Sequence, residues 1–398
     1  MSRTGGGVGA AGRARVRPAG LLAAAGLLAA TACSAGAGRS AAVKASTTPG
    51  TSPSNASAAA SGMASRLAYV DTAGVHVVSL DASGGRTGAP VLASAGAVPA
   101  DSVRDLAWSA NGRWLGWLQD DGGQLVLYDS RAGGRRSWPV SAGELAVTDA
   151  GAVVLADDHL TSYRPDGGVG PAVPATVGGE GLTVGTRTPR TTHFGTPVAS
   201  FAGGFVVDDQ LAADRHRLGL LAPDGAGRYL GEAEVSGPPW GIAAVSPDGR
   251  TLAAERGDHT DFCGVGPASE LVLVDLGSGS RQRVAAPVAG SRGTPRFQQL
   301  SFAGGVWGAS LASCDSGVDL HASAYFELTG GSWRLVKDGV LAAARSPGGL
   351  LAFSTGRRRG EWPIEIVGTR ALMVEGPQGS LPLGTSDEFA WSPTATAG

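Results

Sequence analysis

The chain has few charged residues, and very few of its basic residues are lysines. Of its 32 basic residues only Lys44 and Lys337 are lysines, and charged residues make up 17% of the 398 positions. The formal net charge is −2, so the sequence lacks the basic excess that is typical of nucleic-acid-binding proteins. The 64 glycines show no period of three, which excludes a collagen-like chain. We therefore expect no nucleic-acid partner and a globular fold rich in turns.

Familiar catalytic and metal-binding motifs are also missing from the sequence. The chain has no Walker loop, no His-Glu-x-x-His and no Cys-x-x-Cys. The nearest approach to a Gly-x-Ser-x-Gly nucleophile turn is Ala289–Gly293, which has Ala at the first glycine position. His259 and His321 each lie near a cysteine and offer metal ligands together with neighbouring aspartates, but polar loops are the interpretation we favour. We assign no catalytic residue, no metal ion and no cofactor.

Residues 1–32 have the three parts of an export signal. Four arginines lie within the first 18 positions, an apolar run follows from 19 to 32, and Cys33 comes next. The run is shorter than the ~20 residues that a helix needs to cross a bilayer. The segment Ala30-Thr31-Ala32-Cys33 resembles the lipobox of bacterial lipoproteins, although Ala30 stands where Leu is usual. The resemblance implies lipidation of Cys33 and anchoring on the extracytoplasmic face of the cell membrane. Ordinary cleavage after an Ala-x-Ala-like site is the alternative.

The remaining sequence divides into a tether and one large domain. Residues 33–64 consist almost entirely of Ser, Ala, Gly, Thr and Pro after the cysteine, a composition that cannot bury enough apolar surface to fold, so we expect a disordered tether. Cys263 and Cys314 are the only cysteines of the domain over residues 65–398. Because exported proteins favour disulfides, we predict a bond between them; two separate buried thiols are the alternative.

A strand, turn and strand pattern recurs along this domain. The plainest copies contain Ser246-Pro247-Asp248-Gly249 and Ser109-Ala110-Asn111-Gly112, and weaker copies contain Ser346 and Ser392. In chain order these four serines are separated by 137, 100 and 46 residues, which correspond to steps of 46 to 50. Pro, Asp and Gly suit the central positions of tight turns. Repeats of this length with about four strands each are typical of a β-propeller.

The turn Ser246–Gly249 with its flanking strands resembles the repeat of TolB-like and WD-repeat-like propellers. The resemblance implies an all-β fold with a single β-propeller of four-stranded blades over residues 65–398, and counting the copies of the repeat gives seven blades. Six blades start near residues 106, 145, 199, 243, 300 and 342. Residues 66–80 supply second and third strands without a first strand, and Phe389–Pro393 supplies a first strand without a following repeat. We predict that the N- and C-terminal strands pair in one composite blade and close the ring, which leaves no free sheet edge.

One position of the repeat collects polar residues. Four residues before the turn position, four blades carry Asp105, Glu144, Gln299 and Glu388. If first strands line the channel, these side chains meet at one rim and form a net-negative mouth suited to a cationic or polyhydroxyl ligand. The loops that lead to this rim contain Arg104, Trp240 and Arg296. The alternative is that these strand ends simply face water.

Three functions fit these features. The leading one is a membrane-tethered, monomeric binding or scaffold module for a cell-envelope protein or small ligand. The alternative is an envelope hydrolase or lyase that acts on carbohydrate or peptide through carboxylates such as those of Asp105, Glu144 and Glu388. The third is a sensor or accessory lipoprotein that works with a membrane partner. The fold alone does not choose among them, because propellers serve all three roles.

Overall fold

The chain separates into two parts, residues 1–54 and residues 55–398. The computed structural model describes residues 63–99, 102–120, 122–141, 143–184, 194–212, 215–232, 234–235, 240–256, 270–287, 294–314, 320–359, 365–367, 370–386, 388–394 and 396–397. The predicted signal peptide, Cys33 and most of the tether lie outside the described residues, so their roles stay predictions. Among the described residues, no helix is long and apolar enough to cross a lipid bilayer.

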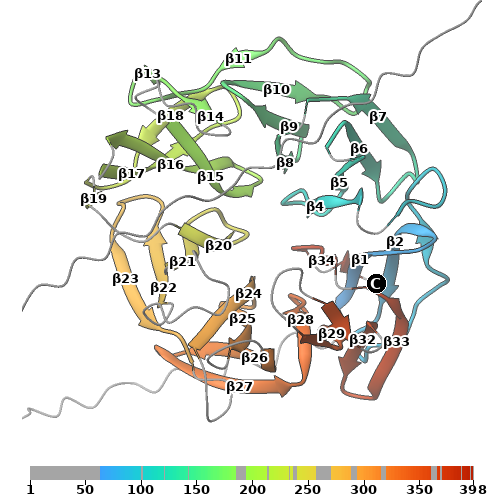
Figure 1. Cartoon of the computed structure of the whole chain (residues 1–398). Coiled ribbons are helices and arrows are strands. Elements are labelled where there is room, and N and C mark those ends of the chain that lie inside the picture. The colour runs from blue at the N-terminus through green and yellow to red at the C-terminus, as the bar shows by residue number, and fades with distance from the viewer. Residues whose placement is uncertain are drawn as a thin grey trace, which may run out of the picture. The chain divides into compact units, whose positions relative to one another are not determined.

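The described part of the chain is all-β and forms seven four-stranded antiparallel blades (Figure 1). Blade 1 contains β34 (Phe389–Trp391), β1 (Met63–Asp71), β2 (Gly74–Leu80) and β3 (Val91–Leu92). Blade 2 contains β4 (Arg104–Trp108), β5 (Trp114–Gln119), β6 (Gln124–Asp129) and β7 (Arg135–Pro139). Blade 3 contains β8 (Glu144–Thr148), β9 (Gly151–Ala156), β10 (His159–Tyr163) and β11 (Val173–Pro174).

The other four blades follow in chain order around the ring. Blade 4 contains β15 (Phe194–Phe201), β16 (Gly204–Ala212), β17 (Arg215–Leu221) and β18 (Ala226–Tyr229). Blade 5 contains β20 (Trp240–Val245), β21 (Thr251–Arg256), β22 (Glu270–Asp275) and β23 (Arg281–Ala285). Blade 6 contains β24 (Thr294–Ala303), β25 (Val306–Cys314), β26 (Leu320–Thr329) and β27 (Ser332–Asp338). Blade 7 contains β28 (Val340–Arg345), β29 (Leu351–Thr355), β32 (Ala371–Gly376) and β33 (Gly379–Thr385).

Short strands extend blades 4 and 1, and a separate hairpin lies within the chain segment of blade 7. Four of them join the sheet of blade 4: β12 (Thr176–Val177), β13 (Glu180–Gly181), β14 (Thr183–Val184) and β19 (Glu234–Val235). A separate hairpin of β30 (Arg357–Arg359) and β31 (Glu365–Val367) lies between β29 and β32 in the chain. The last strand, β35 (Thr396–Ala397), pairs with the start of β1.

The core consists of seven apolar clusters, one between each pair of neighbouring blades. In β9, Val153 packs into the cluster shared with blade 4, whereas the next residue, Val154, packs into the cluster shared with blade 2. Successive side chains of a strand point to opposite faces, so a blade with neighbours on both sides needs apolar residues at consecutive positions. This explains why the second strands read as short continuous apolar runs.

The recurring serine turns have the same hydrogen bonds in different blades. In blade 5 the hydroxyl of Ser246 donates to Asp248 Oδ1 at 2.6 Å and accepts the amide of Thr251 at 2.9 Å. In blade 2 the hydroxyl of Ser109 donates in the same way to Asn111 Oδ1 at 2.9 Å. The glycine that follows, Gly249 in blade 5, has a φ of +68°, a conformation that favours glycine.

The two ends of the folded domain meet in blade 1, which confirms the predicted closure. In this blade β34 pairs with β1, with Tyr69 opposite Phe389 and Leu67 opposite Trp391. The amide of Val70 also donates to the carbonyl of Glu388 at 3.1 Å. Because β34 comes from the C-terminus and the other three strands from the N-terminal part, neither end can leave without opening the ring.

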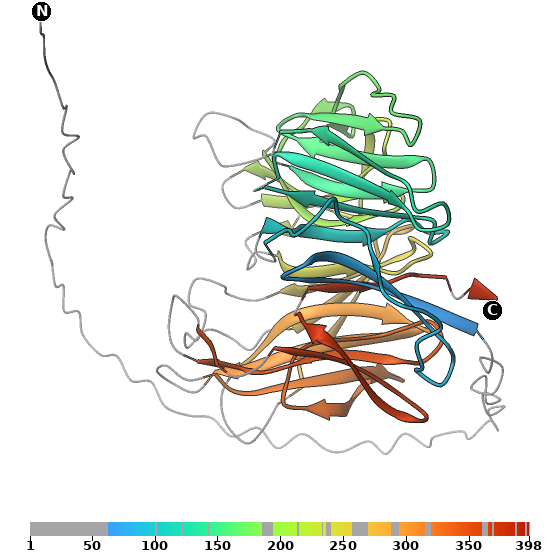
Figure 2. The ribbon, with the colours of Figure 1, turned by 90° about the vertical axis from the view of Figure 1, so that its right-hand side faces the viewer.

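The first strand of each blade is the innermost strand, and these seven inner strands contact one another in a closed circuit around the channel (Figure 1). We call the end of the channel where inner strands start, such as Glu144 in β8, the entry mouth. The end where they pass into the serine turns, such as Ser246 after β20, is the turn mouth. Figure 2 shows the blades edge-on, with the strands crossing from one end of the ring to the other.

Candidate functional site

The entry mouth is where the sequence predicts the polar rim, and a bulge shapes it in blade 2. In β4, Arg104 pairs with Leu118 and Ala107 pairs with Gly116, so two residues of β4 lie opposite one residue of β5. Asp105 is in this bulge and has a φ of +57°, which is strained for most residues and tolerated best by Gly, Asn and Asp. A bulge of this kind redirects a side chain away from the regular alternation of the strand.

The carboxyl groups of Asp105 and Glu144 interact across the boundary between blades 2 and 3. Both side chains are half-buried, and burial raises the pKa of Asp105, with Arg104 opposing the shift. Burial and the negative charge of Asp105 raise the pKa of Glu144 to about 7. Because the charge of Asp105 contributes to that shift, Asp105 loses its proton first. Glu144 therefore keeps its proton up to about pH 7.

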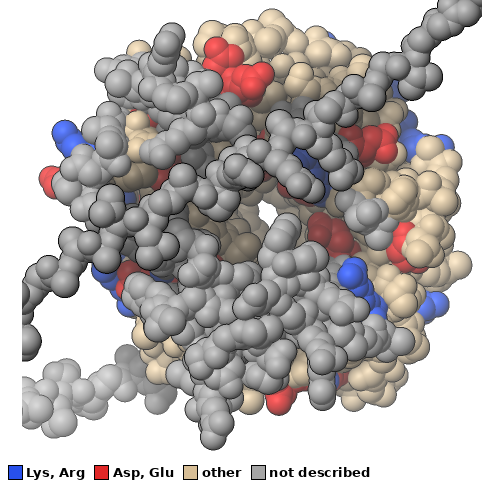
Figure 3. Space-filling view, viewed as in Figure 1, with Lys and Arg blue, Asp and Glu red and all other residues tan. Residues whose placement is uncertain are grey.

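Glu388 and Gln299 lie on two other inner strands. Glu388 directly precedes β34 in blade 1, next to blade 2, and its side chain is half-buried. Gln299 follows a bulge in β24 of blade 6, on the opposite side of the ring, and its buried Oε1 has no hydrogen-bond partner among the described residues. Of the predicted rim, the structure thus brings Asp105, Glu144 and Arg104 into electrostatic contact and places Glu388 on the adjacent blade. Figure 3, viewed as Figure 1, shows Asp and Glu side chains beside the central opening.

Trp240 has a different environment from the rim carboxylates. It starts β20, and the guanidinium groups of Arg256 and Arg281 lie 4.9 Å and 5.9 Å from the centre of its ring. The indole packs against the apolar cluster between blades 4 and 5, so its contacts explain a role in joining these blades. The side chain of Arg296 lies outside the described residues, and its predicted role at the rim stays a prediction.

Sequence reasoning missed a buried polar group between blades 4 and 5. Asp208 in β16 contacts His216 Nδ1 in β17 at 3.0 Å. Burial raises the pKa of Asp208, and the nearby charges of His216 and Arg256 oppose that shift. The neighbouring Asp209 accepts a hydrogen bond from the hydroxyl of Tyr229 at 2.7 Å. The available signal was two consecutive acids directly after an apolar run in a second strand, a position that is otherwise buried between blades.

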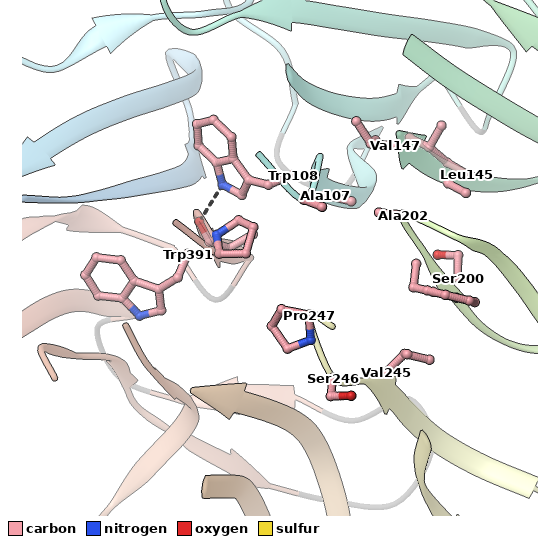
Figure 4. Close-up of a pocket in the computed structure, with 15 residues that line it drawn as sticks. Ala107, Trp108, Leu145, Val147, Ser200, Ala202, Val245, Ser246, Pro247 and Trp391 are labelled. Atoms are coloured by element: carbon pink, nitrogen blue, oxygen red, sulfur yellow. Dashed lines mark hydrogen bonds between the residues drawn. The ribbon is translucent and has the colours of Figure 1, made fainter. Parts of the chain in front are cut away.

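The turn mouth contains an apolar pocket with a volume of about 190 Å³. It is lined by residues from blades 1 to 5: Ala107, Trp108, Ala110, Leu145, Ala146, Val147, Ser200, Phe201, Ala202, Val245, Ser246, Pro247, Ala390, Trp391 and Pro393. Figure 4 shows residues from these blades around the central space. Trp108 Nε1 donates to the carbonyl of Ala390 at 3.0 Å, and Trp391 Nε1 donates to that of Ala344 at 2.8 Å. Both indoles are therefore fixed in place with their N–H groups already satisfied.

No protein-family model and no curated protein sequence matches the chain. Solved structures with a similar fold include the periplasmic gluconolactonase PpgL of Pseudomonas aeruginosa, with 15% identity, a TM-score of 0.50, and coverage of 83% of this chain and 99% of PpgL. The dihydro-heme d1 dehydrogenase NirN matches with 16% identity, a TM-score of 0.43 and coverage of 82% and 75%. AztD of Citrobacter koseri matches with 13% identity, a TM-score of 0.42 and coverage of 83% and 98%. At these identities the similarity extends to the propeller fold alone.

The predicted disulfide and the histidines beside it fall outside the part of the chain that can be assessed. Cys263 and His259 lie outside the described residues. Cys314 ends β25 and His321 is in β26, but the side chains of both are outside the described set. Within the described ranges, no group of three or more His, Cys, Asp and Glu side chains is arranged to hold a metal ion. The disulfide stays a prediction.

Proposed function

We propose that this protein is an extracytoplasmic hydrolase that cleaves a carbohydrate bond at the entry mouth, with Glu144 as general acid and Asp105 as general base. The observation that carries the proposal is the unequal pair of half-buried carboxyl groups on neighbouring inner strands. Two titratable groups whose environments separate their pKa values are what acid and base catalysis in one site requires.

Each group has a defined task in the reaction. Glu144 is protonated up to about pH 7 and donates its proton to the leaving oxygen as the carbon–oxygen bond breaks. The carboxylate of Asp105 takes a proton from the attacking water, whose oxygen forms the new bond to carbon. Proton exchange with solvent then restores the starting states of both groups. The positive charge of Arg104 opposes the rise in the pKa of both groups and so favours the ionised form of Asp105.

The surroundings of the pair support a polyhydroxyl substrate. The half-buried carboxyl group of Glu388, on the next blade, adds a hydrogen-bond acceptor to the entry mouth. Sugar hydroxyls are donors that such acceptors bind. PpgL, named a periplasmic gluconolactonase, has the same fold, and it serves here as a precedent for the fold without any transfer of residues.

The proposed site of action is the outer face of the cell membrane. The basic and apolar segments of residues 1–32 and the lipobox-like sequence before Cys33 support export and lipid anchoring. The serine turns support the narrower relationship to TolB-like propellers, because their hydrogen bonds repeat between blades 2 and 5. Lipidation of Cys33 would keep the domain at the outer face of the cell membrane.

The test is turnover of 4-nitrophenyl glycosides and glucono-δ-lactone by the full chain and by Glu144→Gln and Asp105→Asn. Because general acid or base catalysis contributes about 100-fold or more, each variant should lose at least that much of kcat. The control is Asp157→Asn, since Asp157 is also an aspartate with positive φ, at +52°, but it is exposed. Retained activity in both rim variants, or no turnover of the panel by the unaltered chain, would contradict the proposal.

A binding or scaffold role for an envelope component is the second candidate. The observation that favours it is the preformed apolar pocket at the turn mouth, which is lined by five blades and holds no acid–base pair among its lining residues. A chain that binds panel compounds without turning them over would favour this role over hydrolysis.

A further inference from the structure

We propose that the turn mouth binds small amphiphilic cations, in which an aromatic or alkyl group carries an ammonium or guanidinium group. The apolar part enters the pocket, and the positive charge lies at the outer edge between Asp149 and Asp248. This inference is independent of the hydrolase proposal, since the two sites lie at opposite ends of the channel.

The pocket itself selects an uncharged apolar group. None of its fifteen lining residues is charged, and three of them, Trp108, Phe201 and Trp391, are aromatic. The indole N–H groups of both tryptophans already donate to backbone carbonyls, so a polar group entering the pocket would lose hydrogen bonds to water with little replacement. Apolar cavities of about 150 Å³ bind benzene, and the volume of about 190 Å³ here is suited to one ring with a short substituent.

The outer edge supplies negative charge. A second depression shares Ala110, Phe201, Ala202 and Pro247 with the pocket and is lined in addition by Asp149, Gly203, Asp248 and Gly249. It is therefore continuous with the pocket and contains two carboxylates. The Ser246 hydroxyl and the amide of Arg250 hold the pKa of Asp248 below its usual range, so this group is ionised at neutral pH.

Local contacts hold both carboxylates in position without neutralising them. Asp149 Oδ1 accepts the amide of Asn111 at 2.9 Å. The guanidinium of Arg250 approaches Asp248 at 3.9 Å, but both side chains are more than half exposed, and such an ion pair is weak in water. A ligand cation whose apolar part is held in the pocket can therefore displace Arg250 from Asp248.

The pocket is built from tight turns and is preformed. The ring of Phe201 lies against the turns, since a Cβ added to Gly203 would come within 2.4 Å of it and one added to Gly249 within 3.2 Å. The turn hydrogen bonds of Ser246 fix Pro247 at the edge of the pocket. A preformed site spares the ligand the cost of ordering the protein.

The experiment compares three compounds that share a 2-phenylethyl group and differ in charge. Calorimetric titration of the full chain uses 2-phenylethylammonium, 2-phenylethanol and 3-phenylpropionate. We expect the cation to bind about 3- to 10-fold more tightly than the alcohol, because attraction to two exposed carboxylates in water is weak but favourable, and the anion to bind most weakly. Equal affinity for cation and alcohol, or no binding of any of them, would overturn the proposal.

Two variants locate the binding. The double variant Asp149→Asn/Asp248→Asn should reduce the affinity for the cation to that for the alcohol and leave the alcohol unaffected. The Ser246 turn should tolerate Asp248→Asn because blade 2 has Asn111 in the equivalent position with the same hydrogen bond. An asparagine at position 149 keeps the side-chain oxygen that accepts the amide of Asn111. Ala110→Leu should fill the pocket and weaken the cation and the alcohol alike by at least tenfold. Unchanged affinity in either variant would contradict the assigned site.

A matched control separates site-specific charge from the net charge of the protein. Asp166 is an exposed turn aspartate of blade 3 that accepts the amide of Gly168 at 2.8 Å, and it is absent from the pocket lining. Asp166→Asn should leave all three affinities unchanged. Thermal unfolding of each variant reports whether the ring remains intact. If Asp166→Asn weakens the cation as much as the double variant does, the effect is a general one and the proposal fails.

Discussion

The two mouths of the channel are formed by the same seven inner strands and yet differ in chemistry. At the entry mouth β4 and β8 begin with charged residues, among them Asp105 and Glu144, whereas at the turn mouth the inner strands end in an uncharged pocket. The backbone is also less regular at the entry mouth than at the turn mouth. Five inner strands, β4, β15, β20, β24 and β28, shift register before their last residues, while several then pass into uniform serine turns.

This difference shows where a repeat fold has freedom to vary. The serine turn uses its side-chain hydrogen bonds to close the chain, so its residues are largely committed to structure. The entry end carries bulges, and each bulge can redirect a side chain without breaking the rest of the blade. The carboxyl groups with raised pKa values, Asp105 and Glu144, are thus found at the irregular end, and the apolar pocket is found at the regular end.

The most severe way to disturb both mouths is to open the ring. Deletion of residues 389–398 removes β34 and β35, and with them Phe389 and Trp391 from the cluster between blades 1 and 7. Loss of two such aromatic side chains costs on the order of 5 kcal/mol or more, so the melting temperature should fall by about 10 °C or more. Differential scanning calorimetry measures this change.

A shorter deletion provides the control for ring opening. Removal of residues 396–398 leaves β34 paired with β1 and takes away only the pairing of β35. Its melting temperature should stay close to that of the full chain. An equal fall in both truncated chains would show that the ring does not depend on β34.

The second test uses the pH dependence of stability to probe the entry mouth alone. The folded chain keeps the proton of Glu144 up to about pH 7, whereas the ordinary pKa is 4.5. Between these values the folded state binds more protons than the unfolded state, so the carboxyl group makes stability fall as pH rises, and the penalty is constant above about pH 7. With allowance for partial exposure, we expect about 2 kcal/mol.

Urea unfolding at pH 5 and pH 8 measures this pH-dependent change in the free energy of unfolding. Glu144→Gln should be more stable than the unaltered chain at pH 8 and should show a much smaller gain at pH 5. Glu232→Gln, a change at an exposed glutamate, should have little effect at either pH. The pKa assignment for Glu144 would be wrong if its variant gained the same stability at both values.

The smallest expected changes in stability are at the turn mouth, where one variant removes a charge and another alters the backbone conformation. Asp248→Asn should change stability by less than about 0.5 kcal/mol, because an asparagine fills the same role at Asn111. Gly249→Ala should cost about 1–2 kcal/mol, because Gly249 has a φ of +68°. Urea unfolding of the two variants at pH 7 gives both values. A larger cost for Asp248→Asn would mean that its charge stabilises the turn.

Much of the fold could be predicted from the sequence because it depends on short-range chemistry. The spacing of Ser109, Ser246 and Ser346 marks turns, and the missing first strand at one end matches the extra one at the other. The turn spacing predicts the number of blades, and the unmatched strands at the two ends predict that they pair in one composite blade. The residues of the polar rim could also be predicted, because residues at the same position of each repeat occupy equivalent places in their blades.

Tertiary structure alone decided which side chains interact. Asp105 and Glu144 are 39 positions apart in the sequence, and only the packing of blades 2 and 3 brings them close enough to change the pKa of Glu144. Likewise, Asp208 and Arg256 influence each other across the contact between blades 4 and 5. The turn-mouth pocket takes its shape from five blades. A repeat determines each blade locally, but the distance between side chains of different blades depends on how the whole ring closes.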